Sequence, residues 1–435
     1  MNNSIWTNNV RLPEFGQLQE DIKTDVLIIG GGMAGLLCAH RLTKAGAECI
    51  LIEADRVMHG VSRNTTAKVT SQHGLVYHKL VRRFGAETAY KYWKINEDAI
   101  GAMERLAGET DCDWEKKDHF VFSTGDLRPL KEEMASLIRA RIPAQWAQSV
   151  PLPMSVTGAV RFANQAQFHP LKFARHLVQG LRIYENTRAI QFLGNRVTTQ
   201  YGTISASKII VATHFPMLNK HGMYFLKLYQ KRSYVLALED GPQVEGMYLA
   251  AEENGISLRN AGKLLLVGGG GHRTGKKGAG WQPAEDFVRK YAPHAREVCR
   301  WATQDCMSLD DLPYIGTYSR STPDLFVATG FNKWGMTNSM VSAMILEDLV
   351  QGKENSYAPI FSPSRAMLRP QLACNGVETA VNLLTPTAPR CPHMGCSLKW
   401  NPLEHSWDCA CHGSRFDKDG KLLDNPATGD LKKTR

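Results

Sequence analysis

Short apolar runs flanked by glycine or polar residues recur along the chain, at residues 25–29 (DVLII), 208–213 (KIIVAT) and 324–330 (DLFVATG). Runs of this length, rich in Val and Ile, predict strands that are buried on both faces of a parallel sheet. Apolar residues at helical spacing follow two of these runs, over residues 36–45 and about 336–349. Strands that alternate with helices predict an α/β fold.

The middle of the chain has a different pattern. Residues 75–142 mix charged and apolar positions at helical spacing, so they predict mostly helix. Residues 223–266 alternate more as strands do, for example at 232–238 (RSYVLAL) and from 263 onward. The four glycines at 268–271 lack a following apolar helix and a second strand with a terminal acid, so they predict a loop at a strand end.

The first predicted strand runs directly into a G-x-G-x-x-G pattern. In such a pattern Gly30 permits a tight turn, Gly32 lets the backbone approach a pyrophosphate, and Gly35 lets the helix pack closely on the strand. The helix N-terminus offers N–H groups and a positive dipole end to the phosphates. The next predicted strand ends at Glu53, whose carboxylate can accept hydrogen bonds from ribose hydroxyls. These features predict a dinucleotide site, but they do not choose between FAD and NAD.

The formal net charge of +10 raises the question of a nucleic-acid partner. Lys and Arg are scattered, however, and no basic helix or basic patch with interleaved aromatic residues occurs, so we expect no nucleic-acid binding. The N-terminal residues do not resemble a signal peptide, and no apolar run reaches about 18 residues, so no integral membrane segment is expected. A cytoplasmic location is the default expectation.

The ordered set of motifs resembles the glycine oxidase and D-amino-acid oxidase superfamily of FAD enzymes. The matching pieces are the glycine pattern, the strand that ends at Glu53, the V-A-T strand, the D-x-P-x-I-G segment at 311–316 and the A-T-G-F segment at 328–331. The resemblance covers roughly residues 25–351 and implies a Rossmann-like FAD-binding domain with an α+β substrate domain. The expected FAD-binding domain comprises 22–75, 160–222 and 309–355, and the substrate or cap domain comprises 76–159 and 223–308.

The same resemblance implies which residues contact FAD. Relatives place a polar loop along the flavin at the position of residues 60–68, although an ordinary capped turn is an alternative interpretation of this segment. The last strand–helix junction lies beside the flavin ring, where a helix N-terminus stabilises negative charge on reduced flavin. The expected cofactor-binding residues are Gly30, Gly32, Gly35, Glu53, Thr65, Thr66, Lys68, Thr213, Gly330 and Met336.

A Cys/His-rich pattern lies near the C-terminus, where C-x-H-x-G-C at 391–396 is followed by C-x-C-H-G-S at 409–414. Cys and His at short spacing suit tetrahedral zinc, so a structural zinc site is one interpretation. The pattern resembles Rieske proteins more closely, in which two Cys bind one iron and two His bind the other iron of a [2Fe–2S] cluster. Carried over by position, the cluster ligands are Cys391, His393, Cys409 and His412.

Cys396 and Cys411 match the positions of a loop-bridging disulfide in respiratory Rieske proteins, although disulfides are uncommon in the cytosol. Ala410 stands where relatives often have Pro. Few residues precede the first cluster loop: 356–384 reads as a linker, with one candidate strand at 377–384. We therefore expect a minimal, all-β Rieske module at 385–435 that leans on the flavoprotein for cover.

No convincing catalytic triad or carboxylate pair is present, so the catalytic residues stay unknown. Arg232, Tyr234 and Arg259 are candidates for substrate recognition, whereas His214 is more typical of a packed core histidine than of an FAD contact.

The whole architecture resembles bacterial FAD oxidoreductases with a C-terminal Rieske domain. The leading hypothesis is a dehydrogenase that oxidises a small amine or amino-acid-like substrate and passes electrons from FAD through the cluster to an acceptor protein. The alternatives are a reductase that receives electrons through the cluster from a donor protein, and a non-catalytic redox sensor.

Overall fold

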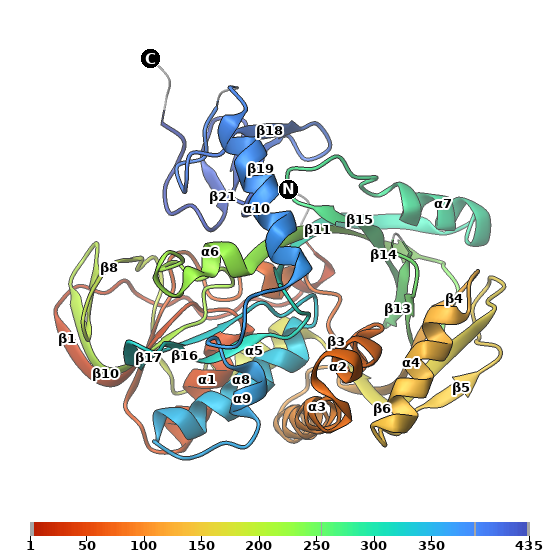
Figure 1. The fold of residues 1–435 in the computed structure, drawn as a ribbon, viewed down its shortest axis with the longest axis horizontal. Helices are drawn as coiled ribbons and strands as arrows, with labels where there is room; N and C mark the ends of the chain where they lie inside the picture. The colour runs from red at the N-terminus through yellow and green to blue at the C-terminus, as the bar shows by residue number, and fades with distance from the viewer. Residues whose placement is uncertain (1–3, 254, 387–388, 433–435) are drawn as a thin grey trace.

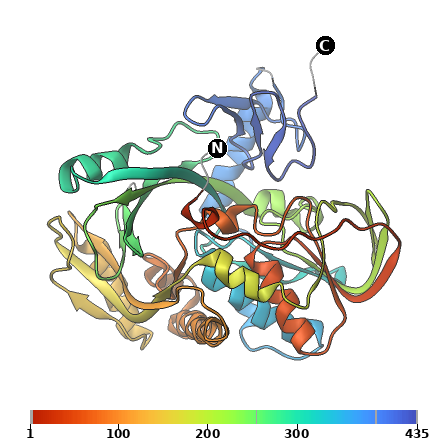
Figure 2. The same ribbon diagram turned by 180° about the vertical axis from the view of Figure 1, so that it is seen from behind.

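The computed structural model describes residues 4–253, 255–386 and 389–432. These residues form a parallel-sheet domain, a second sheet beside it and a small C-terminal module that lies across the top of both (Figure 1). Seen from behind, the N-terminal segment crosses the parallel-sheet domain (Figure 2). Within the described residues no helix has the length and apolar character needed to cross a bilayer.

The parallel sheet has β1 (Ile22–Ile29) at its centre. Val26 and Ile28 enter one apolar cluster and Leu27 and Ile29 enter another, so both faces of β1 are buried. The β1 strand pairs in parallel with the strands on both sides of it. The strands of the main path, in spatial order, are β16 (Tyr314–Ser319), β17 (Thr322–Thr329), β10 (Thr203–Val211), β1, β2 (Cys49–Ile52) and β7 (Arg182–Tyr184), and β8 (Ala189–Leu193) with β9 (Arg196–Thr199) extends β10.

Helices cover this sheet on the side of the Val26 cluster. The helix after the glycine turn, α1 (Met33–Lys44), packs against α5 (Pro170–Leu177) and α8 (Gly335–Val350). Short helices complete the domain: η1 (Ile5–Thr7), η2 (Val61–Asn64), η3 (His221–Met223), α6 (Tyr224–Lys227) and α9 (Ala358–Phe361).

The second sheet is mostly antiparallel and has nine strands within the described residues. Its main path, in spatial order, is β15 (Arg296–Ser308), β11 (Leu228–Glu239), β14 (Leu264–Arg273), β13 (Ser257–Ala261), β12 (Met247–Ala250), β4 (Glu115–Ser123), β6 (Gly158–Gln167) and β3 (Lys68–Val69), with β5 (Gln145–Ala147) on β6. The helices of this domain are α2 (Val76–Phe84), α3 (Ala86–Ala107), α4 (Arg128–Arg139) and α7 (Gln282–Tyr291).

Three sequence-based expectations about this region are corrected. The glycines at 268–271 lie inside β14, where Gly268 pairs with β11 and β13 and Gly269 pairs with β11, so they are not a loop at a strand end. The predicted helical region 75–142 also contains the strand β4. The expected boundary at 159/160 cuts β6, because this strand belongs wholly to the second sheet.

The C-terminal module has a four-stranded antiparallel sheet in its described part. Its strands are β18 (Leu398–Asn401), β19 (Ser406–Cys409), β20 (Arg415–Asp417) and β21 (Leu422–Asp424). The segment before it is helical: α10 (Pro370–Leu384) replaces both the expected strand at 377–384 and much of the expected linker. Pro370 lies in the first turn of α10, where proline favours a helix start, and a short apolar run does not by itself separate strand from helix.

Candidate functional site

The junction of β1 and α1 requires glycine at two positions. Gly30 has a φ of +112°, and a Cβ atom there would lie 2.5 Å from the carbonyl oxygen of Ala212. A Cβ atom at Gly35 would lie 1.9 Å from the carbonyl oxygen of Gly30. Gly32 is the N-cap of α1, so this turn presents the start of the helix to the space above it. The backbone therefore forms the close-approach cradle that a pyrophosphate needs.

Glu53 follows β2 and points at this turn. Its Oε2 accepts a hydrogen bond of 2.7 Å from the N–H of Gly31, and its Oε1 accepts one of 2.9 Å from the N–H of Asp55. Burial raises the pKa of the Glu53 carboxyl, and these backbone hydrogen bonds oppose that effect. Each carboxylate oxygen has a further lone pair for a ribose hydroxyl. The residues present therefore fit the adenosine half of FAD.

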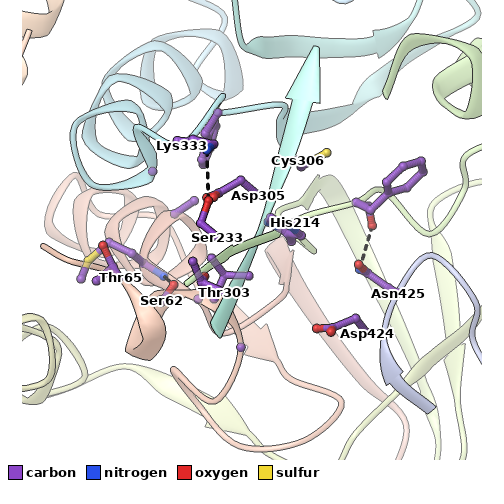
Figure 3. A pocket seen from close by; sticks show the side chains of 18 of the residues that line it. Ser62, Thr65, His214, Ser233, Thr303, Asp305, Cys306, Lys333, Asp424 and Asn425 are labelled. Carbon is purple, nitrogen blue, oxygen red and sulfur yellow. Dashed lines mark hydrogen bonds between the residues drawn. The ribbon is translucent and has the colours of Figure 1, made fainter. Parts of the chain in front are cut away.

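A cavity of about 920 Å³ begins at the glycine turn and continues between the two sheets. Its size is at the upper end of the range for ligand pockets. Figure 3 shows part of this cavity with side chains from both sheets and from the C-terminal module. The structure places these expected FAD residues on its wall: Gly30, Gly32, Glu53, Thr65, Thr66, Lys68, Thr213, Gly330 and Met336. Gly35 lies beneath the turn instead.

Lys68 is in strand β3 and not in a loop. Its Nζ donates a hydrogen bond of 2.9 Å to the carbonyl oxygen of Tyr248 and also contacts Ser257. Burial lowers the pKa of Lys68 to about 7, and the nearby Arg259 guanidinium adds to the effect. Arg259 itself is buried against the Trp6 ring and does not line the cavity. Its expected role in substrate recognition therefore finds no support in this position.

Sequence reasoning missed Lys333 and Asp305, which lie together on the cavity wall (Figure 3). Lys333 lies in the junction between β17 and α8 with a φ of +74°, and its Nζ donates a hydrogen bond of 3.0 Å to Oγ of Ser233. Burial lowers the pKa of Lys333, while Asp305 opposes this effect. Burial raises the pKa of Asp305, while Lys333 opposes it. Both side chains line the cavity, so both can act on whatever binds there.

The sequence did hold a clue to Lys333, which lies three residues after Gly330, at the junction that the family resemblance places beside the flavin.

His214 was expected to be a packed core residue, and the structure corrects this expectation. It lines the cavity with a φ of +65°, and its Nε2 lies 3.1 Å from Oε1 of Gln230.

The two Cys/His loops come together in the C-terminal module. Cys391 and Cys409 are buried, and the rings of His393 and His412 are 4.9 Å apart between centroids. Within the part of the chain that the structure describes, the Nδ1 atoms of both histidines are buried without a hydrogen-bond partner. Two thiols and two unpartnered imidazole nitrogens fit the ligand set of a Rieske cluster.

Cys396 and Cys411 are joined in a disulfide that links the two loops. The sulfur of Cys409 also lies within 4.8 Å of both of these sulfurs. A disulfide offers no thiolate, so these two cysteines are not available as ligands and the set remains two Cys and two His.

The flavoprotein part covers the histidine side of the module. His393 Nε2 lies 2.8 Å from Oδ1 of Asn219, and Phe215 presents its ring edge-on to both histidines. Phe225 of α6 packs in the same way on His412. The two cluster histidines therefore face the flavoprotein, as expected for a module that leans on it for cover.

A hydrogen-bonded link joins the second cluster loop to the wall of the cavity. Gln230 of β11 donates to the carbonyl oxygens of His412 (3.0 Å) and Asn425 (2.7 Å). Asn425 in turn donates to the carbonyl oxygen of Thr213 (2.7 Å). Gln304 of β15 donates to Gln230 Oε1 (2.9 Å) and to the carbonyl oxygen of the residue after His412 (2.8 Å).

Arg232 and Tyr234 also serve this interface. Arg232 is buried in a salt bridge with Glu404 of the β18–β19 turn, and the hydroxyl of Tyr234 donates to the same carboxylate (3.0 Å). The structure thus corrects the expectation that Arg232 recognises substrate, because its guanidinium is occupied by Glu404. Tyr234 still reaches the cavity wall.

Comparison with protein families supports both the FAD site and the cluster site. Residues 25–349 match the DAO family, described as FAD dependent oxidoreductase, and residues 382–435 match the Rieske [2Fe-2S] domain. The chain belongs to the DAO family of FAD-dependent oxidoreductases and carries a C-terminal Rieske domain. It is an enzyme, and its cofactors are FAD and a [2Fe–2S] cluster.

The full-length relative YhfW of Bacillus subtilis (strain 168), provisionally named a Rieske 2Fe-2S iron-sulfur protein, is 35% identical over 99% of this chain and 97% of its own length. Among solved structures, glycine oxidase from Geobacillus kaustophilus gives a TM-score of 0.67 at 19% identity, covering 79% of this chain and 99% of that one. L-proline dehydrogenase from P. horikoshii gives 0.68 at 17% identity, covering 80% and 98%. At such identities the two structures support the fold alone.

Proposed function

We propose that this protein is a dehydrogenase that oxidises a small amine or amino-acid-like substrate and passes electrons from FAD through the Rieske cluster to an acceptor protein. The observation that carries the proposal is the continuity of the two sites. One cavity is lined both by the glycine turn and by residues 421–428 of the Rieske module. The link through Thr213, Asn425 and Gln230 then reaches the loop that carries His412. Bound FAD takes up an electron pair, and the cluster is a one-electron carrier.

The cavity wall offers groups that suit an amino-acid-like substrate. Lys333 can pair with a carboxylate, because its ammonium group has only the Ser233 hydroxyl as a hydrogen-bonding partner among the described residues. Asp305 can accept a hydrogen bond or a proton from the substrate amine, since burial raises the pKa of its carboxyl. The proposed substrate class is also the one named for two proteins of the same fold, glycine oxidase and L-proline dehydrogenase.

An anaerobic screen of amino acids and small amines tests this proposal. A substrate should bleach the flavin absorbance, and the electron-paramagnetic signal of the reduced cluster should follow. Lys333→Met should raise KM for a carboxylate-bearing substrate much more than for the matching amine that lacks the carboxylate. Lys263→Met, at an exposed lysine in the β13–β14 turn, is the matched control.

A different result of the same screen would favour the reductase alternative. If no amine or amino acid bleaches the flavin, and a reduced donor protein reduces the cluster before the flavin, electrons run in the opposite direction.

A further inference from the structure

Helix α10, which leads into the Rieske module, has its polar side buried and its apolar side exposed. The side chains of Asn375 and Asn382 are 3% and 1% exposed, whereas Val377, Val381 and Leu384 are 64%, 54% and 82% exposed. Residues at spacings of three and four lie on one face of a helix, so the three apolar residues form a single stripe. An ordinary surface helix has the opposite arrangement.

Hydrogen bonds hold α10 in this orientation. Oδ1 of Asn375 accepts a hydrogen bond of 2.8 Å from Arg273, which also donates to the carbonyl oxygen of Cys411 (2.9 Å) in the second cluster loop. The carbonyl oxygen of Asn382 accepts a hydrogen bond of 2.9 Å from the N–H of Ser397. Because these polar contacts are satisfied inside the protein, the outward direction of the stripe is a fixed feature of the fold.

The stripe ends at the loop that carries the first cluster ligands. Arg390 donates hydrogen bonds of 3.0 Å to the carbonyl oxygens of Leu383 and Gly395, which ties the end of α10 to this loop. Pro392 and Gly395 of the loop are exposed, and His393 between them is partly exposed. Any protein seated on the stripe would therefore lie beside the exposed part of the loop that carries Cys391 and His393.

The unpaired charges at the end of the stripe are basic, since Glu378 of α10 is paired with Lys276. Arg390 is exposed next to it, and the exposed Lys220 follows Asn219, which contacts His393. None of the exposed residues of α10 is charged; they are Pro370, Ala373, Cys374, Gly376, Val377, Ala380, Val381, Leu383 and Leu384. A second copy of this chain would bring the same basic groups against the first, whereas an acidic partner would be attracted to them.

We propose that the apolar stripe (Val377, Val381 and Leu384) and the basic edge (Lys220 and Arg390) form the docking surface for a small electron-carrier protein with an acidic surface around its redox centre. The proposal rests on the proposed electron transfer through the cluster and adds the place and charge of the partner. Complexes for electron transfer bury little surface, and a stripe of one helix with a charged edge is of that scale.

Binding to the resting protein, with no substrate present, tests the surface without any turnover. The probe is zinc-substituted plastocyanin, a small acidic protein, titrated calorimetrically into the full-length protein with both cofactors bound; basic cytochrome c is the mismatched probe. Plastocyanin should bind more tightly at low salt than at high salt, and better than cytochrome c. The double variant Val381→Ser/Leu384→Ser and the variant Lys220→Glu should each weaken binding about tenfold. Leu193→Ser and Lys263→Glu, at exposed positions on other strands and turns, should not.

Three results would overturn the proposal. The first is equal plastocyanin affinity in the wild type and in both docking variants, or no binding of plastocyanin at all. The second is a dimer in solution that dissociates in Val381→Ser/Leu384→Ser, which would make the stripe a contact between copies. The third is cosedimentation with phosphatidylglycerol vesicles that is lost in the same variant, which would make it a membrane contact. None of these results affects the bleaching of flavin by substrate, so failure here is distinct from failure of the proposed dehydrogenase function.

Discussion

Among the residues of the expected FAD site, Glu53 is the one whose substitution should weaken FAD binding most selectively. We expect Glu53→Ala to weaken FAD binding roughly 10- to 100-fold, because hydrogen bonds to a charged group contribute about 1.5–3 kcal/mol. Glu53→Gln keeps one acceptor oxygen and should fall between Ala and the wild type. The measurement is FAD retained after ultrafiltration, with the cluster spectrum as the internal reference. Glu20→Ala, an exposed acid outside the cavity, is the control. Unchanged FAD affinity in Glu53→Ala would remove Glu53 from the cofactor site.

The cluster ligands should behave in the complementary way. The wild-type protein should contain about one FAD and two iron atoms per chain. His412→Ala should abolish the Rieske electron-paramagnetic signal and leave the flavin absorbance unchanged, because the ligand lies in a separate module. His294→Ala, at an exposed histidine outside the Rieske module, is the control and should keep both signals. Zinc in place of iron in the wild type would contradict the Rieske assignment.

Residue-level prediction from sequence depends on how local the constraint is. The glycines of the β1–α1 turn could be predicted because the backbone itself excludes a Cβ atom there. The cluster loops could be recognised because each carries its ligands within a few residues. The proximity of Lys333 and Asp305 could not be predicted from the sequence. Lys333 lies just before α8 and Asp305 lies in β15, and only the tertiary fold brings them together. Arg232 was misassigned for the same reason, since its partner Glu404 is far away in sequence.

At the scale of secondary-structure elements, β11 positions the second cluster loop through Gln230. Gln230→Leu would remove the side-chain donor to the carbonyl oxygens of His412 and Asn425, at a cost of roughly 1–3 kcal/mol for the buried His412 contact. We expect the variant to retain FAD and iron and to pass electrons more slowly from photoreduced flavin to the cluster. Flash photolysis with absorbance detection measures that rate. Gln282→Leu, on the exposed start of α7, is the matched control. An unchanged rate would mean that Gln230 only stabilises the fold.

Strands and helices were predictable where pattern and length agreed, as in β1, α1 and α8. They were not predictable where a short apolar run stood alone. Residues 377–384 looked like one strand, but their apolar positions form the outward stripe of α10. The glycines at 268–271 looked like a loop, yet they lie inside β14, where Gly268 pairs with both neighbouring strands and Gly269 pairs with β11. In both cases tertiary contacts decided the structure.

At the scale of the whole molecule, two general properties support the proposed direction of electron flow, from FAD to the cluster. Two neutral His ligands in place of two thiolates give clusters of this type a comparatively high potential, roughly −150 to +300 mV. Fusion in one chain also raises the effective concentration of cluster near the flavin, to the order of millimolar. The hydrogen bonds of Gln230 and Gln304 to the second cluster loop hold the Rieske module against the cavity, so it does not have to diffuse to the flavin before each transfer.

We therefore expect that substrate added without oxygen reduces FAD first and the cluster second. Anaerobic rapid mixing that follows both chromophores measures the order. In Cys409→Ala or His412→Ala, substrate should still reduce the flavin at the wild-type rate, because neither residue lines the cavity. Reoxidation of the flavin by the acceptor protein should slow in the same variants, because the one-electron route to the surface is lost. Reduction of the cluster ahead of the flavin, by substrate or by a natural donor, would contradict the dehydrogenase proposal and establish the opposite direction of flow.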